Sequence, residues 1–166
     1  MMQTYIILLR GINVGGHKKI KMTDLKALLE KAGFESIRSY IQSGNIILQS
    51  SDTDETHLAT KIAALIKETY TFEVPVMVRN FNDWKSAIEA QPFDIEDTSK
   101  LHLTFLSEIP EKEKMESIDP NKFLPTETFK IINRTVYLHC SKGYGNSKLT
   151  NGFWEKKLNL SATTRN

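Results

Sequence analysis

The chain has 166 residues, of which 40% are hydrophobic and 25% are charged, and this composition is typical of a folded globular protein rather than a disordered one. The net charge of +2 is too small to indicate a class of partner, and no apolar segment approaches the roughly 20 residues that cross a bilayer, so we expect no membrane association. The single cysteine, Cys140, excludes an internal disulfide and favours a reducing compartment. We therefore expect a cytoplasmic protein.

The first half of the chain predicts the order strand, helix, strand, strand, helix, strand. Residues 5–9 form a continuous apolar run, which is typical of a strand covered on both faces. Apolar residues then recur at helical spacing after Thr23, a good N-cap, and Gly33 suits the end of that helix. Further strands are expected at residues 37–41, 46–48 and 74–78, with a second helix near residues 52–69.

The second half repeats most of this order. We expect a linking helix at 81–90, a strand at 101–106, a short helix at 111–117, a hairpin of strands at 129–132 and 136–139, and a last helix at 149–158. The final strand of the first half has no counterpart. We therefore predict an α+β protein of two ferredoxin-like halves, residues 1–80 and 81–166, the second incomplete and the two packed as one compact protein.

A glycine-rich segment, Gly11-Ile12-Asn13-Val14-Gly15-Gly16-His17-Lys18, follows the first strand. It is not a P-loop, because that motif needs Gly-Lys-Ser/Thr directly before a helix, whereas here His17 follows Gly16. Exposed backbone amides in such a loop can bind an anion when positive side chains lie nearby. The alternative is that the glycines only permit a positive φ in a long connection. The candidate ligand-binding residues of this region are Arg10, Asn13, Gly15, Gly16, His17 and Lys21.

Two further polar segments contain candidate ligand-binding residues, which are Gln42, Ser43, Asn45, Tyr144, Ser147 and Lys148. The first segment is the expected turn between the second and third strands, and Ser-Gly-Asn is also ordinary turn chemistry. The second segment is a basic loop before the last helix, where Ser147 could instead be the N-cap. This loop is not a dinucleotide fingerprint, because Lys148 replaces the third glycine and no βαβ unit surrounds it.

The sequence predicts neither a metal site nor a bound cofactor. The four histidines are widely scattered, and His139-Cys140 alone cannot complete a tetrahedral site. Neighbouring strand residues point to opposite faces, so His139 is poorly placed to activate Cys140 as a nucleophile. No Ser-His-Asp set or close pair of carboxylates follows from spacing, and no catalytic residue is assigned.

Several of these segments together resemble a bacterial family, the domain of unknown function 1697 (DUF1697). The resemblance rests on residues 9–22, 33–34, 40–45 and 142–149, and on Ala162-Thr163-Thr164-Arg165-Asn166. It implies a duplicated α+β, ferredoxin-like fold and no established activity, substrate or catalytic residue. Arg165, a cationic side chain in the last of these segments, is a further candidate ligand-binding residue. Because the family pattern continues beyond Thr-Arg-Asn into a further helix, it also implies that the second half lacks a C-terminal helix.

The segments that resemble the family are loops rich in Gly, Asn, Ser and cationic side chains, which core packing does not require. Our leading hypothesis is that the protein binds an anion, either nucleotide-like or a nucleic-acid backbone, at a basic, glycine-rich cleft. Nucleic acid is favoured because some RNA-binding modules use the ferredoxin-like unit. It is weakened because the expected strands at 46–48 and 136–138 contain only one aromatic residue, Tyr137.

Two alternatives remain open. An enzyme acting on a phosphorylated small molecule would place Arg10 or Lys21 on the phosphate and use His17 as acid or base, although no second catalytic group is identifiable. A non-catalytic interaction or oligomerisation module would join the acidic stretch 81–129, with eleven Asp and Glu against five Lys and Arg, to a basic end of another chain. The sequence sets no oligomeric state.

Overall fold

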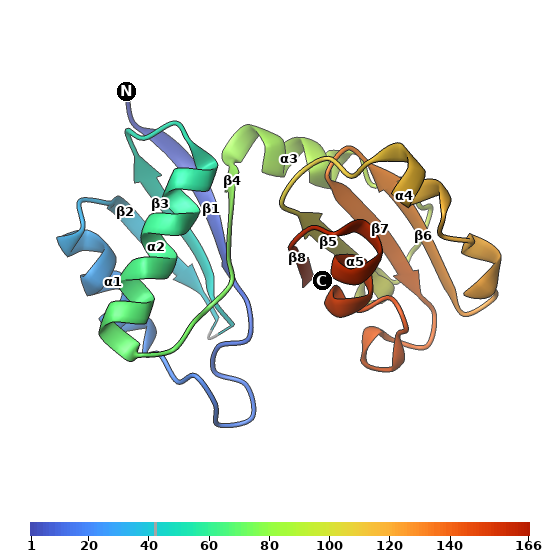
Figure 1. Ribbon diagram of the computed structural model, residues 1–166, viewed down its shortest axis with the longest axis horizontal. Helices are drawn as coiled ribbons and strands as arrows, with labels where there is room; N and C mark the ends of the chain where they lie inside the picture. Colours follow the sequence, from blue (N-terminus) through green and yellow to red (C-terminus); the bar gives the residue numbers. More distant parts are fainter. Residues whose placement is uncertain (42) are drawn as a thin grey trace. The chain divides into compact units, whose positions relative to one another are not determined.

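The computed structural model describes residues 1–41 and 43–166, and the chain divides into two compact units, Met1–Ile88 and Glu89–Asn166 (Figure 1). We describe each unit by itself. Both contain helices and a four-stranded antiparallel sheet, so the chain is a mixed helix-and-sheet protein, as its sequence predicts. Among the described residues, no helix is both long and apolar enough to cross a membrane.

The first unit has the order β-α-β-β-α-β, followed by a helix. Its strands are β1 (Gln3–Leu9), β2 (Glu35–Tyr40), β3 (Asn45–Ser50) and β4 (Val76–Asn80), and its helices are α1 (Met22–Lys31), α2 (Glu55–Tyr70) and α3 (Phe81–Glu89). The sheet order is β2-β3-β1-β4, and every neighbouring pair is antiparallel. The helix α3, which we expected to open the second half, is grouped with this unit except for its last residue.

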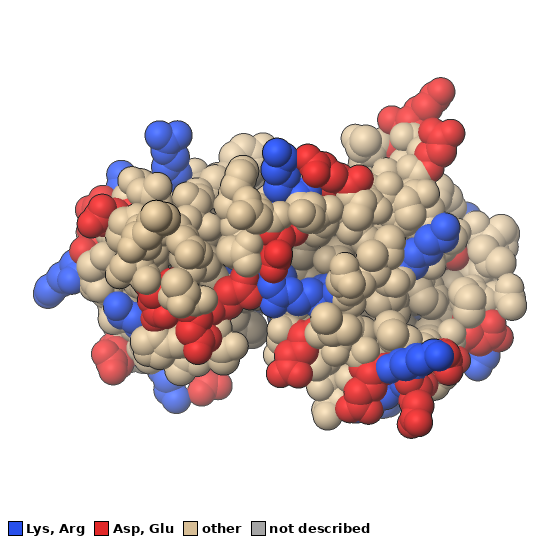
Figure 2. Space-filling model, turned by 90° about the horizontal axis from the view of Figure 1, so that it is seen from above, with Lys and Arg blue, Asp and Glu red and all other residues tan. Residues whose placement is uncertain are grey.

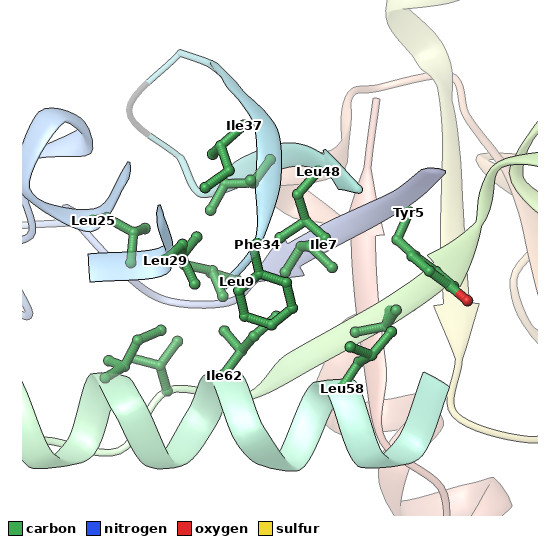
Figure 3. Packing of buried hydrophobic residues seen from close by; sticks show 14 of the residues in the cluster. Tyr5, Ile7, Leu9, Leu25, Leu29, Phe34, Ile37, Leu48, Leu58 and Ile62 are labelled. Carbon is green, nitrogen blue, oxygen red and sulfur yellow. The ribbon is translucent and has the colours of Figure 1, made fainter. Parts of the chain in front are cut away.

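The core of the first unit lies between the sheet and the helices α1 and α2. Alternate residues of β1 (Tyr5, Ile7 and Leu9) are buried on the face that the helices cover (Figure 3). The helices contribute residues three or four positions apart, which are Leu25 and Leu29 from α1 and Leu58, Ile62 and Ile66 from α2. This packing fixes the direction of β1, and hence the point at which the glycine-rich segment leaves the sheet.

The two helices begin differently. The Asp54 carboxylate is the N-cap of α2 and accepts the backbone amides of Thr56 at 2.9 Å and His57 at 3.1 Å. Thr23, expected as the N-cap of α1, instead lies inside the first turn, because Lys21 occupies the N-cap position without a side-chain cap. The sequence pattern therefore located α1 correctly but misplaced its start.

The second unit repeats the strand and helix order of the first. Its strands are β5 (Leu101–Leu106), β6 (Glu127–Ile132), β7 (Thr135–Cys140) and β8 (Ala162–Arg165), its α-helices are α4 (Lys112–Glu116) and α5 (Asn151–Leu158), and its 3-10 helices are η1 (Thr98–Lys100), η2 (Pro120–Lys122) and η3 (Tyr144–Asn146). The sheet order is β6-β7-β5-β8. Trp154 of α5 is fully buried in its core and packs edge-to-face on Phe129 and Phe153.

The expectation that the second unit lacks the last strand of the repeated order is wrong. The strand β8 pairs antiparallel with β5, from Ala162 opposite Leu106 to Arg165 opposite Leu103. The hydroxyls of Thr104 and Thr164 lie 2.7 Å apart across this pair. Four residues are too few for an alternating pattern to be distinguished from a polar tail, which is why the sequence analysis missed the strand.

Candidate functional site

The glycine-rich segment forms a tight turn in the loop between β1 and α1. The amide of His17 donates to the carbonyl of Val14 at 3.0 Å, and φ at the two residues between them is +58° for Gly15 and +76° for Gly16. Positive φ at both central positions is the pattern of a type I′ turn, which glycine adopts without steric cost. The turn therefore explains why both positions are glycine.

Asn13 closes the base of this loop. Its Oδ1 accepts the amide of Ile20 at 2.8 Å, and its Nδ2 donates to the carbonyl of the same residue at 3.0 Å. Its own amide donates to the carbonyl of Lys18 at 3.1 Å. The side chain of Asn13 thus shapes the loop, and we expect it to position the neighbouring cations rather than to contact a ligand.

The turn between β2 and β3 meets the start of this loop. The amide of Leu9 donates to the carbonyl of Gly44 at 2.9 Å, and a Cβ at Gly44 would lie 3.1 Å from Ile12 Cδ1. The Asn45 Nδ2 donates to Ser43 Oγ at 2.9 Å, within the turn itself. Two segments that are more than twenty residues apart in the sequence, 10–21 and 43–45, therefore lie at one end of the same sheet. Gln42, also a candidate, lies outside the described residues.

Positive side chains gather at this end of the first unit. Residues 10–21 contain Arg10, Lys18, Lys19 and Lys21 and no Asp or Glu. The Nζ of Lys18 donates to the carbonyl of Glu73 at 2.6 Å and ties the loop to the segment before β4. We use the name basic edge for Arg10, His17, Lys18, Lys19, Lys21, Ser43 and Asn45.

Two of these lysines are available to a ligand. Lys19 and Lys21 are exposed, and within residues 1–41 and 43–166 their side chains make no hydrogen bond or ion pair. Unlike Lys18, they can turn toward an anion without losing a contact inside the protein. They are therefore the positions at which binding can be tested with least damage to the fold.

The opposite end of the first unit, where β1 begins, carries a mixture of charges. On the face that Figure 2 views from this side, Lys and Arg side chains are interspersed with Asp and Glu. A surface pocket here is lined by Gln3, Thr4, Asn80, Phe81, Asn82 and Asp83. Its lining includes a carboxylate and no Lys or Arg, so this pocket does not suit an anion.

Of the candidates in the second unit, Tyr144, Ser147 and the backbone of Lys148 take part in its own structure, whereas the Lys148 side chain is exposed. The backbone amide of Lys148 donates to the buried carboxylate of Glu127, at 3.1 and 3.3 Å from its two oxygens. Ser147 Oγ accepts the amide of Leu149 at 2.9 Å, whereas the N-cap of α5 is Thr150, not Ser147. The sequence analysis missed Glu127, because a carboxylate that holds a distant loop has no local signal.

An aromatic contact lies in this part of the second unit. The ring of Tyr144 stacks on His102 with centroids 4.7 Å apart. Burial lowers the pKa of His102, so its imidazole is neutral at pH 7. Tyr137, the single aromatic residue of the expected strands at 46–48 and 136–138, is only 1% exposed and is not available to a ligand in this fold.

Arg165, the remaining candidate, is part of β8. It is half-buried, its guanidinium donates to the carbonyl of Thr164 at 2.9 Å, and burial lowers the pKa of the side chain. Among the described residues, no three His, Cys, Asp or Glu side chains are grouped so that they could hold a metal ion. Arg165 is therefore less accessible to a ligand than the exposed lysines of the basic edge.

Comparisons with known proteins agree with this fold and add no activity. A family model described as a protein of unknown function, DUF1697, matches residues 2–137. The conserved bacterial protein SP0830 from Streptococcus pneumoniae has a similar structure, with a TM-score of 0.73 and 25% sequence identity, over 100% of this chain and 93% of that chain. No curated protein matches the chain.

Proposed function

The chain belongs to the DUF1697 family, and we propose from the geometry of the basic edge that its first unit binds an anionic ligand, either nucleotide-like or a nucleic-acid backbone. One observation supports this most directly. The hydrogen bond between Leu9 and Gly44 joins the turn at 43–45 to a loop that contains four Lys and Arg and no acidic residue. Packing of the core does not require cations at this place, because they lie on an exposed loop.

The rigidity of the loop also supports binding. Asn13, the type I′ turn and the bond from Lys18 to Glu73 fix the backbone of the loop before any ligand arrives. A preorganised loop loses less conformational entropy on binding than a mobile one, so more of the electrostatic attraction contributes to affinity. The cations of the basic edge therefore form a prepared surface for phosphate or another anion.

A second part of the proposal concerns the topology of the two units. We propose that each unit is ferredoxin-like, since each has the order β-α-β-β-α-β with the two middle strands of the sheet contributed by its first and third strands. Some RNA-binding modules use this arrangement. This resemblance of topology supports an anionic ligand only weakly, because one fold serves many functions.

Thermal unfolding and titration calorimetry test the proposed function. The ligands are inorganic pyrophosphate, ATP and a 12-nucleotide single strand, each added to the full chain at low salt. An anion that binds only the folded protein stabilises it by about 2.7 kcal/mol at a hundredfold excess over Kd. We expect at least one of the three to bind, and the double variant Lys19→Ala/Lys21→Ala to lose most of that affinity.

The matched control is Lys156→Ala/Lys157→Ala, which removes the same charge from two exposed lysines of α5. This control should bind like the original protein. The proposed function is wrong if no anion binds, or if the two double variants weaken binding equally, since the second result would indicate only a general dependence on net charge.

A further inference from the structure

We infer that the ligand of the basic edge is a single-stranded nucleic acid, with its phosphates on the loop lysines and one base stacked on the ring of Tyr40. This inference rests on the proposed function and specifies its ligand. It starts from an aromatic side chain that the sequence analysis did not single out. Tyr40 is the last residue of β2 and is 73% exposed.

Tyr40 lies next to the turn at 43–45, which is part of the basic edge. Tyr40 pairs with Asn45 across the β2–β3 ladder, and the Asn45 Nδ2 donates to the Tyr40 carbonyl at 3.3 Å. Gly44, next to Asn45, is bonded to Leu9 at the start of the loop. The β2 strand is two strands from β1 in the sheet, or about 10 Å, so Tyr40 and the start of the glycine-rich loop lie on either side of the turn at 43–45.

The neighbours of Tyr40 suit a nucleic-acid strand. Arg38, two residues earlier on β2, lies on the same face of the sheet and is exposed. It pairs with Ile47, which is exposed by 43% although it lies on a strand in the middle of the sheet. A guanidinium beside an aromatic ring and an apolar side chain can contact a phosphate and the face of a base at once.

The openness of the site favours a polymer over a mononucleotide. Residues 14–19 are all exposed, and a small-ligand site usually buries 70–90% of its ligand, which this loop cannot do. A nucleic acid needs no such enclosure, because release of counterions from several phosphates supplies the affinity. A single strand is favoured over a duplex, because only unpaired bases can leave their neighbours and stack on a protein ring.

Fluorescence anisotropy with a labelled 12-nucleotide single strand, as RNA and as DNA, and with the duplex of the same sequence, tests this inference at several salt concentrations. We expect the single strand to bind more tightly than the duplex. We expect Tyr40→Ala to weaken single-strand binding by about fivefold to a hundredfold, and Tyr40→Phe to retain it. Phe81→Ala, at an exposed aromatic residue of α3, is the matched control and should change nothing.

The salt dependence of binding distinguishes the contribution of the Tyr40 ring from that of the loop lysines. The slope of log K against log salt should become shallower by about 1.4 in Lys19→Ala/Lys21→Ala, at about 0.7 per phosphate contact of a single strand. Tyr40→Ala should leave this slope unchanged, because it removes no charge. A ring that only supported the fold would instead alter the unfolding midpoint, which is measured on the same samples.

The outcomes distinguish this inference from the proposed function. The inference is overturned if duplex and single strand bind equally, or if Tyr40→Ala binds like the original protein. It is also overturned if pyrophosphate or ATP binds at the basic edge while no oligonucleotide does, a result that would leave the proposed function standing. If no anion binds at all, both are wrong.

Discussion

The backbones of Leu9 and Gly44 approach each other so closely that there is no room for a side chain at position 44. The amide of Leu9 donates to the carbonyl of Gly44 at 2.9 Å, and a Cβ on Gly44 would lie 2.7 Å from Leu9 Cβ and 3.1 Å from Leu9 O. Gly44 also has φ of +83°, a conformation that favours glycine. This contact joins the β2–β3 turn to the end of β1. It therefore brings together the two segments of the basic edge, residues 10–21 and 43–45.

The variant Gly44→Ala should lower the free energy of unfolding by about 2–5 kcal/mol. Left-handed backbone costs a residue with a Cβ about 1–2 kcal/mol, and overpacking adds about 1–3 kcal/mol. Urea unfolding measures the loss. Gly11→Ala is the control, because its φ of +76° imposes the first cost while its Cβ would meet nothing within 4 Å. Equal losses in the two variants would contradict the close approach of Leu9 and Gly44.

The variant Asn13→Ala should open the base of the glycine-rich loop. It removes both side-chain hydrogen bonds to Ile20, each of which contributes about 0.5–1.5 kcal/mol. The Ile20 amide, which donates to Asn13 Oδ1, should then exchange with deuterium faster than in the original protein. Val14→Ala changes an exposed side chain of the same loop and should leave this exchange rate unchanged. Unaltered exchange in Asn13→Ala would show that the loop closes without Asn13.

The sequence predicted the elements whose apolar pattern is long or continuous. The strand β1 and the helix α2 are examples, because burial of their apolar residues is decided by the periodicity of a single segment. The strand β8 was missed because it has four residues and is defined by its pairing with β5, which lies far away in the sequence. Pairing between distant segments leaves little trace in a local pattern.

The candidate site was predicted less well than the fold, for a related reason. A tyrosine in a strand can face the core or the solvent, and the local pattern does not say which. Tyr137, the single aromatic residue noted in the expected strands at 46–48 and 136–138, is buried, whereas Tyr40 was not singled out and is exposed. The chemistry of the loop at 10–21 could be inferred from its composition, but the closeness of the turn at 43–45 depends on the strand order β2-β3-β1.

The pair Asp52 and His57 gives a pH-dependent prediction. The backbone amide of Asp54 and then the imidazole of His57 donate to the Asp52 carboxylate and lower its pKa below the ordinary 3.8. A lowered pKa in the folded state contributes stability above the pKa of the unfolded chain, and this stability is lost as the pH falls through the folded pKa. Asp52→Asn should therefore be less stable than the original protein at pH 7, and the difference should shrink below about pH 4.

Urea unfolding of both proteins at pH 7, 5 and 3 measures this difference. The control is Glu68→Gln, which neutralises a carboxylate near the C-terminal end of α2, where negative charge is unfavourable to the helix. The control should not be destabilised at pH 7. A difference between Asp52→Asn and the original protein that stays constant from pH 7 to pH 3 would contradict the role of the ionised carboxylate.

Cys140 should react with thiol reagents only when the second unit opens. The side chain is 1% exposed, and burial raises the pKa of its thiol above the ordinary 9.0, although a bond to Ser147 Oγ opposes this shift. At pH 8 the native thiol is both protonated and shielded, so its reaction with Ellman's reagent should be at least tenfold slower than in urea. An exposed cysteine, introduced as Lys156→Cys in a Cys140→Ala background, should react at similar rates in both conditions. A native Cys140 that reacts as fast as this control would contradict its burial in the core cluster that also contains Trp154 and Leu158 of α5.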